Sequence, residues 1–366
     1  MSEFPSHRNS TWVRDSLMQA KTSWCYELGP IEINEVEDAL NYLMSLHKPP
    51  LQCHPDDFPL PYLDKILKRA LTECEFHSGV FLLRGLPVHN KTKRQARWLG
   101  WGIGLHLGVP LAQNQKGELL VDVLDKKQQQ SQPMRDHRNN CEMEFHVDSC
   151  DLVTLLCLSK AAKGGCSKVA SSLNIYHWLA THCPSAIEIL STSLPFLNVS
   201  ATPLSSGFFM CPVFAHSQGA FTCRFYRKRI LASQNLIDAP RLSPSALQAL
   251  EKFHEKACMP ESYIEIDLKP GDLQFLNNHV VCHARTQFQD GDTPDQQRHL
   301  LRQWFATACS RPLPVDLGPA YGSIEAGTLR GGYQGWAVIP EIESFQASLA
   351  RANRLNHQPL PAGNHP

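Results

Sequence analysis

The stretch CEMEFHVDSCDLVTLLCLS, residues 141–159, places His146 and Asp148 one residue apart at the start of a long apolar run. The apolar run predicts a buried strand, and side chains at positions i and i+2 of a strand point to the same side. The side chains of His146 and Asp148 can therefore bind the same ligand. Because a buried carboxylate is costly unless it is paired or binds a metal, the pair indicates a metal site.

A second His-x-Asp pair, His54 and Asp56, occurs in the segment CHPDDFPLP. That segment is rich in proline and no strand follows it, so nothing would hold the two side chains on one face. The chain contains 17 histidines, so such a pair is weak evidence without its local context. The context favours the pair at His146 and Asp148.

A third ligand is predicted far along the chain, in GDLQFLNNHVVCHARTQF. There, His283 follows the apolar residues Val280, Val281 and Cys282. Two histidines and one carboxylate form the facial triad of non-haem Fe(II) oxygenases, which leaves coordination positions open. His279 in the same stretch is the rival ligand, and we prefer His283.

The segment RHLLRQWFA indicates a carboxylate-binding strand. Alternation places Arg298, Arg302 and Trp304 on one face. A buried guanidinium pairs with a carboxylate, which it can bind through two hydrogen bonds. An internal salt bridge to a distant Glu or Asp is the alternative. The Gly164–Gly165 pair predicts a tight turn, after which Ser167 could donate its hydroxyl to the same carboxylate.

The composition excludes several classes of partner. Lys plus Arg and Asp plus Glu are 35 each, so we expect neither nucleic acid nor an anionic membrane as a partner. No apolar run approaches the ~20 residues of a spanning helix, and the first residues lack the apolar segment of a secretory signal. Thirteen cysteines without a CxxC pair indicate reduced, buried thiols and a cytoplasmic protein.

Hydrophobic periodicity predicts helices over residues 33–46, 61–74 and 243–257, the last with Ser243 as N-cap, and places 91–97 on a helix face. Strands are predicted over 79–87, 221–230, 263–268, 273–278 and 299–308. Residues 125–140 are strongly polar and predict a loop that could close over a ligand. We therefore expect one domain over 1–350, with a helical part to about 78, a mostly β core over about 79–335, and a disordered tail over 351–366.

Together, FHVDSCDLVTLLCLSKAAKGGCSKVASS, PGDLQFLNNHVVCHART and RHLLRQWFA resemble the TauD/TfdA family of Fe(II)/2-oxoglutarate-dependent dioxygenases. The resemblance covers residues 79 to 333. It implies a double-stranded β-helix (jelly-roll) core with flanking helices, an α+β fold that is mostly β.

The resemblance also implies roles for individual residues. His146, Asp148 and His283 match the Fe(II) ligands. Arg298 matches the arginine that binds the far carboxylate of 2-oxoglutarate, and Arg302 matches a second arginine nearer the metal and the substrate. Ser167 stands where relatives often have a threonine hydroxyl. Val147 replaces a common threonine at a position that points away from the metal.

The implied reaction uses O2 and 2-oxoglutarate, releases succinate and CO2, and hydroxylates or otherwise oxidises an unactivated C–H bond of a small molecule. Because Asp148 is present, the chloride site of the related halogenases is missing. The substrate stays open: a small polar molecule, either anionic or a natural product. Candidate substrate contacts come from the arginine strand, the polar loop and the distal turn: Arg302, Arg135, Arg138 and Asn277. Asn277 could instead support the turn, and the loop could simply be solvated.

Two other classes of function remain. A zinc or manganese hydrolase on a similar barrel could use the same three ligands, but it would leave the inward arginines without a role. A non-catalytic binder of small carboxylates is disfavoured because all ligands and both arginines are present. Relatives are often oligomeric, so a homo-oligomer is also open.

Overall fold

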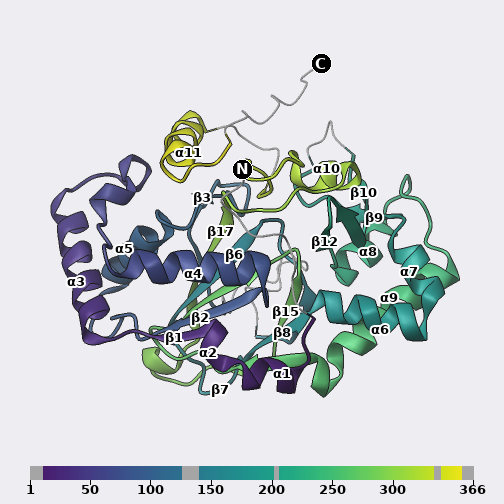
Figure 1. Cartoon of the computed structure of the whole chain (residues 1–366), viewed down its shortest axis with the longest axis horizontal. Coiled ribbons are helices and arrows are strands. Elements are labelled where there is room, and N and C mark those ends of the chain that lie inside the picture. The colour runs from purple at the N-terminus through teal and green to yellow at the C-terminus, as the bar shows by residue number, and fades with distance from the viewer. Residues whose placement is uncertain (1–10, 126–139, 202–205, 334–338, 357–366) are drawn as a thin grey trace.

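The computed structural model describes residues 11–125, 140–201, 206–333 and 339–356. Its core consists of two β-sheets (Figure 1). The larger sheet contains β1 (Cys25–Glu27), β2 (Val80–Arg84), β14 (Leu273–Asn277), β6 (Leu152–Ser159), β17 (His299–Ala306) and β3 (Val109–Pro110) in spatial order, with β4 (Val121–Val123) also paired to β17. The smaller sheet contains β13 (Tyr263–Ile266), β8 (Ser167–Ser171), β15 (Val281–Arg285) and β5 (Met143–His146) in that order.

The chain alternates between the two sheets. It passes from β5 in the smaller sheet to β6 in the larger and back to β8, and later from β13 to β14, then β15, then β17. This alternation is the winding of a double-stranded β-helix. The chain crosses between the sheets twice near the predicted ligands. The crossing from β5 to β6 contains Asp148 and begins at His146, and the crossing from β14 to β15 leads to His283.

Helices of the N-terminal part cover one side of the core (Figure 1). They are α1 (Arg14–Gln19), α2 (Lys21–Trp24), α3 (Pro30–Ser45), α4 (Leu63–Phe76) and α5 (Lys93–Gly104). The helix α4 contacts β2 and β14, and it buries Leu63, Leu67, Ala70 and Cys74 on one face. The periodicity therefore predicted α3 and α4 correctly, because an amphipathic stripe fixes both the element and its buried face.

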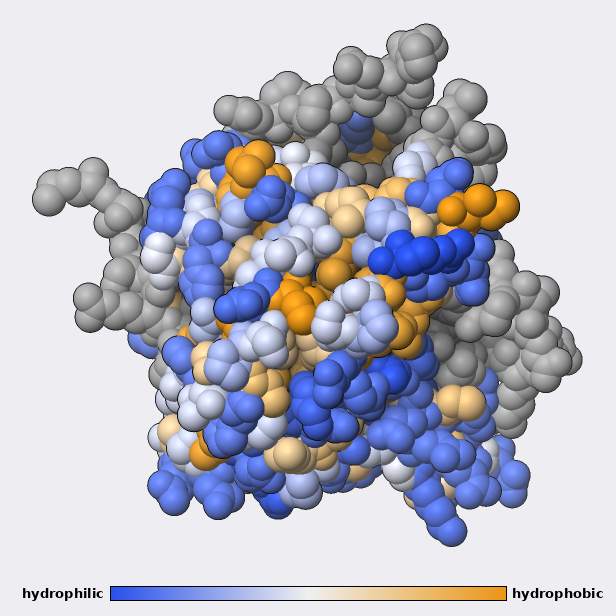
Figure 2. Space-filling model, turned by 90° about the vertical axis from the view of Figure 1, so that its right-hand side faces the viewer, coloured by the Kyte–Doolittle hydropathy of each residue, from blue (hydrophilic) through white to orange (hydrophobic). Residues whose placement is uncertain are grey.

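A long insertion, residues 172–262, separates β8 from β13, although these two strands are antiparallel neighbours. It contains α6 (Ser172–His182), α7 (Pro184–Leu190), β9 (Ser193–Leu197), β10 (Phe208–Pro212), β11 (Phe214–Ser217), β12 (Ala220–Cys223), α8 (Arg227–Ser233) and α9 (Pro244–Cys258). The predicted cap of α9 is confirmed, since the Ser243 hydroxyl accepts from Ala246 N at 3.1 Å. Figure 2 shows this side of the molecule, where hydrophilic residues cover most of the surface and apolar residues form separate patches.

The strand predicted over 221–230 is wrong in its second half. The chain is paired as β12 only to Cys223, and α8 begins at Arg227. The alternation of Phe221, Cys223 and Phe225 is real, but the Arg-Lys-Arg run that follows consists of good helix formers. A helix also turns Ile230 into the core, where it is fully buried.

The C-terminal part contains α10 (Gly318–Tyr321) and α11 (Pro340–Ala352), and Asn356 N donates to Gly327 O at 2.7 Å. Most of the predicted tail and nearly all of the predicted polar loop lie outside the described residues. The single-domain boundaries stay a prediction. Among the helices of the described residues, none has the length and apolar character needed to span a bilayer.

Candidate active site

Three predicted ligands come together at the crossing between the sheets. His146 ends β5, Asp148 follows it, and the antiparallel pairing of β15 with β5 sets His283 opposite His146. His146 Nε2 lies 3.9 Å from Asp148 Oδ1, and His283 Nε2 lies 3.8 Å from Asp148 Oδ2. The ligand atoms of the three residues all lie within 4.8 Å of one another, so one metal ion fits among them.

The protonation states of the cluster suit a divalent metal. His146 Nδ1 lies 2.8 Å from Glu144 O, and a carbonyl can only accept, so Nδ1 carries the proton and Nε2 offers its lone pair. Burial, together with His146, lowers the pKa of His283 to about 3. Burial raises the pKa of Asp148, but Arg302 and the histidines outweigh it and lower this pKa to about 2. Two neutral imidazoles and a carboxylate are the donor set of a non-haem Fe(II) site.

Neighbouring groups orient Asp148. Trp304 Nε1 donates to Asp148 Oδ2 at 2.9 Å, and the Asp148 backbone N donates to Asn278 Oδ1 at 2.9 Å. Arg302 Nη1 lies 3.7 Å from the same carboxylate, while Arg302 Nε donates to Gln113 Oε1 at 2.8 Å. Such contacts fix the direction in which a ligand presents its lone pairs.

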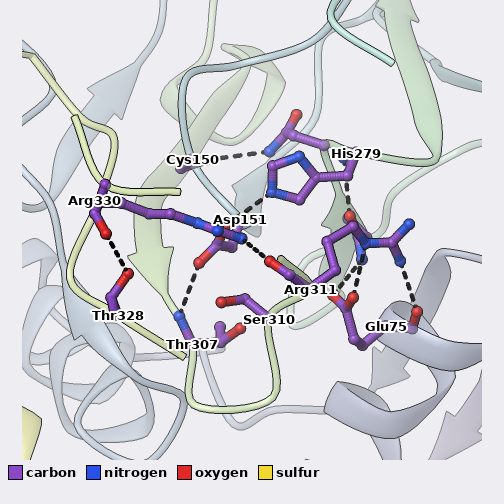
Figure 3. A network of polar contacts seen from close by, with 12 residues as sticks. Glu75, Cys150, Asp151, His279, Thr307, Ser310, Arg311, Thr328 and Arg330 are labelled. Atoms are coloured by element: carbon purple, nitrogen blue, oxygen red, sulfur yellow. Dashed lines mark hydrogen bonds and ion pairs between the residues drawn. The ribbon is translucent and has the colours of Figure 1, made fainter. Parts of the chain in front are cut away.

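His279, the rival ligand, is not a member of this cluster. Figure 3 shows it in a different polar network, together with Asp151. Its Nε2 is 2.8 Å from Asp151 Oδ1, and Asp151 also accepts from Arg330 Nε at 2.8 Å. Both His279 and Arg330 are fully buried. His279 therefore belongs to a buried ionic network, and His283 is the histidine of this stretch that faces Asp148.

A pocket opens beside the cluster and is lined by the predicted co-substrate residues. Its lining consists of His146, His283, Ser167, Arg298, Arg302 and Arg285 with the apolar residues Val123, Met143, Leu155, Ala284 and Leu300. Ser167 Oγ donates to Gln274 Oε1 at 2.9 Å. Sequence reasoning did not single out Arg285. The sequence could have indicated Arg285, because this residue lies two positions after His283 on the same strand and therefore on the same face.

Arg298 is a buried cation with free hydrogen-bonding capacity. Its Nε lies 3.4 Å from Gly165 O, its guanidinium carbon is 5.4 Å from the centre of the Phe288 ring, and its Nη1 has no hydrogen-bond partner within the described segments. Burial and the nearby Arg285 lower the pKa of Arg298 to about 10, so it stays charged at neutral pH. A buried donor without a partner is costly, so the pocket suits an anionic ligand.

Gly165 makes room for this arginine. Its φ is +79°, and a Cβ at this position would lie 2.9 Å from Arg298 Cδ. The glycine pair that predicted a turn is thus also what allows Arg298 to lie against the backbone.

The predicted substrate contacts divide into three groups. Arg302 lines the pocket. Asn277 does not, because its Nδ2 donates to Glu75 Oε2 at 2.7 Å and its Oδ1 accepts from His279 N at 2.8 Å. It thus supports the turn between β14 and β15, which is the alternative that the sequence left open. Arg135 and Arg138 lie outside the described residues.

Comparisons with known proteins show what the chain as a whole is similar to. Residues 46–304 match the model of the family described as "Taurine catabolism dioxygenase TauD, TfdA family". FR-33289 synthase of Streptomyces rubellomurinus is 27% identical over 322 residues, which is 86% of this chain and 94% of that protein. The taurine hydroxylase-like protein SAT17 of Stachybotrys chartarum is 26% identical over 284 residues, 75% of this chain and 73% of that protein.

Solved structures show the same fold. An asparagine oxygenase in complex with Fe(II), 3-hydroxyasparagine and succinate superposes with a TM-score of 0.59 at 19% identity, covering 77% of this chain and 93% of that one. The non-haem iron oxygenase OrfP with iron and α-ketoglutaric acid gives a TM-score of 0.58 at 16% identity with the same coverage. The predicted fold class is confirmed. Because the family model matches most of the chain, this protein belongs to the TauD/TfdA family and is an Fe(II)- and 2-oxoglutarate-dependent dioxygenase.

Proposed function

We propose that His146, Asp148 and His283 hold Fe(II), and that Arg298, with Ser167, binds the carboxylate of 2-oxoglutarate that lies away from the metal. One observation carries this proposal. The three-residue cluster borders a pocket in which a buried arginine has a donor without a partner among the described residues. A dicarboxylate satisfies both ends of that pocket, with one end at the metal and the other at Arg298.

When bound, Fe(II) and 2-oxoglutarate supply the O2 chemistry that yields succinate and CO2 and removes hydrogen from a C–H bond. The chain's residues prepare that chemistry. The two histidines stay neutral and Asp148 stays ionised, so no proton competes with the metal. Trp304 and Arg302 keep the carboxylate in place. The apolar lining of the pocket keeps bulk water away, which strengthens the attraction between Arg298 and its anion.

The substrate is a small polar molecule. The relatives' names refer to taurine and, for a Streptomyces enzyme 25% identical over 213 residues, to uridine-5'-phosphate. The solved structures contain 3-hydroxyasparagine and (3S)-hydroxy-L-arginine. Hydroxylation is the outcome that these products favour. Arg302 lies at the metal end of the pocket and is our first candidate for a substrate contact; Arg135 and Arg138 remain candidates from the polar loop.

The cellular setting is also a proposal. All thirteen cysteines are free, which suits a reducing cytoplasm. The formal net charge of zero supports the absence of a nucleic-acid or membrane partner. Sedimentation of the purified protein tests for a homo-oligomer.

The experiment that tests the proposal is an anaerobic titration of the apoprotein with Fe(II) and 2-oxoglutarate, followed by visible absorption. We expect a weak charge-transfer band that needs both additions. In Asp148→Ala the band and succinate formation should be lost. Tight zinc binding without any band would support the hydrolase alternative instead, and wild-type succinate formation by Asp148→Ala would contradict the ligand assignment.

A further inference from the structure

Gln274 is a polar residue between apolar neighbours in a buried strand. It lies in β14, between β2 and β6 of the larger sheet, and its side chain is fully buried. Leu273 and Phe275 on either side are buried as well. Gln274 is neither a metal ligand nor part of the lining of the pocket that contains Arg298. A buried amide costs free energy unless its donors and its acceptor find partners, so the contacts of this side chain are informative.

The sheet register points the Gln274 side chain toward the space between the two sheets. Gln274 is the cross-strand partner of Leu155, and Leu155 is the partner of Arg302 on the next strand. Residues that are directly opposite on neighbouring strands have their side chains on the same face. Leu155 and Arg302 both line the pocket beside the metal cluster. Gln274 therefore lies on the face of the larger sheet that borders this pocket.

Across the space between the sheets, Gln274 meets Ser167 of β8. Ser167 Oγ lies 2.9 Å from Gln274 Oε1 and donates its proton there. Gln274 Nε2 is buried and has no hydrogen-bond partner among the described residues. Ser167 itself lines the pocket, together with Arg298. One hydroxyl thus has the amide on its inner side and the pocket on its outer side.

The direction of the hydroxyl proton decides what Ser167 can do for an anion. A serine hydroxyl has one proton and two lone pairs. While the proton is donated to Gln274 Oε1, Ser167 presents only lone pairs to the pocket, and lone pairs repel a carboxylate.

A half turn of the Gln274 amide about its last side-chain bond reverses this arrangement. The turn exchanges Oε1 and Nε2, which are similar in size. Nε2 then donates to Ser167 Oγ and gains the partner that it lacks, and the hydroxyl proton is free to point into the pocket. Oε1 loses its partner in exchange, and a charge-assisted hydrogen bond from Ser167 to a bound carboxylate offsets that loss.

We propose that Gln274 is a positioning residue for 2-oxoglutarate. In the loaded protein its Nε2 donates to Ser167 Oγ and thereby directs the single proton of that hydroxyl to the carboxylate that Arg298 binds. This inference rests on the proposed function and deepens it. Gln274 acts through Ser167 and touches neither the co-substrate nor the metal.

The test is a double-mutant cycle on the full chain, loaded anaerobically with Fe(II) and titrated with 2-oxoglutarate. The readout is the Kd taken from the charge-transfer band. We expect Ser167→Ala to weaken binding by about 10- to 100-fold, because a hydrogen bond to a charged group is lost, and Gln274→Met by about 5- to 10-fold. When Gln274→Met is added to Ser167→Ala, the Kd should change by less than about 2-fold, because no hydroxyl remains to be directed.

Gln303→Met is the matched control. Gln303 is another buried glutamine of the larger sheet whose Nε2 has no partner in the described parts of the chain. It follows Arg302 on β17 and so lies on the opposite face, next to Gly104 of α5. This variant should bind 2-oxoglutarate like the wild type. If Gln274→Met does not fold, Gln274→Asn replaces it in the cycle, because its amide is one methylene too short to reach Ser167.

Three results would overturn the inference and leave the proposed function intact. They are a wild-type Kd in Gln274→Met, an equal loss with and without the Ser167 hydroxyl, and a loss of the same size in Gln303→Met. The second result would mean that the amide binds the co-substrate itself or acts through packing alone. A wild type that shows no band with Fe(II) and 2-oxoglutarate would overturn the proposed function and the inference together.

Discussion

At the scale of single residues, Trp304 decides how Asp148 faces the metal. Its indole N–H donates to Asp148 Oδ2, and both side chains are buried. Trp304→Phe keeps most of the ring and removes the donor, so we expect Fe(II) affinity to fall by about 10- to 100-fold. Metal titration measures this. Trp101→Phe is the control, because Trp101 is equally buried but donates to Pro50 O; equal losses in both variants would mean that the indole acts only through packing.

Arg298 and Arg302 differ in the hydrogen-bond and ion-pair partners that they have within the protein. Arg302 has Gln113 and Asp148 beside it, whereas Arg298 has an unpartnered Nη1 among the described residues. Arg298→Gln should therefore raise the KM for 2-oxoglutarate by about 100-fold, because a charged hydrogen bond in a buried site is lost. Arg302→Gln should affect the substrate and the metal more. Steady-state kinetics in which 2-oxoglutarate and the substrate are varied in turn distinguish the two variants. The opposite pattern of KM changes would exchange the roles of Arg298 and Arg302.

At the scale of elements, the turn between β14 and β15 separates two histidines by function. His279 is fully buried and is hydrogen bonded to Asp151, whereas His283 faces Asp148 of the cluster. His279→Ala should lower the free energy of unfolding by about 2 to 4 kcal/mol and keep the metal stoichiometry, because the buried Asp151 loses a partner. His283→Ala should lose the metal. Chemical denaturation and metal analysis on both variants check this, and metal loss in His279→Ala alone would reverse the assignment.

Sequence reasoning reached as far as local pattern and family motif allow. It placed His146, Asp148, His283, Arg298 and Ser167 in one site, and the structure brings them to one cluster and its adjoining pocket. It predicted one strand that continued from β12 into α8, because side-chain alternation with a period of two residues does not show where a strand ends. It also missed Tyr226, whose ring lies 4.9 Å from that of His146, because the β-bridge between these two residues joins segments far apart in the sequence. Such long-range pairing leaves no local signal.

At the scale of the whole molecule, a buried ionic network joins distant parts of the chain (Figure 3). Arg311 Nε donates to Glu75 Oε1 of α4 at 2.8 Å, and Arg330 Nη2 donates to Arg311 O at 2.8 Å. Arg330 also reaches Asp151 at the start of β6. The network thus ties the N-terminal helices, the β core and the C-terminal segment together.

Arg330→Met should therefore cost about 3 to 5 kcal/mol of unfolding free energy, because the buried Asp151 keeps its charge and loses its main cation. Urea denaturation followed by circular dichroism gives the value. Lys68→Met is the comparison: it removes the Lys68–Asp64 pair, whose lysine is 72% exposed, and should cost less than about 1 kcal/mol. Similar losses in the two variants would show that the network adds no more than a surface pair.

The insertion has a consequence for how such enzymes diversify. Residues 172–262 leave the core at β8 and return to it at β13, the strand beside it, so the two ends of the segment are already adjacent. Among the described residues, backbone hydrogen bonds that join it to the core include Val147 N to Phe225 O, Cys223 N to His279 O and Ser172 N to Val280 O. A segment attached in this way can be exchanged as a cassette between related chains while the metal-binding strands keep their register. Chimeras joined at these two strands should therefore still bind the metal after the segment that meets His146 through Tyr226 has been exchanged.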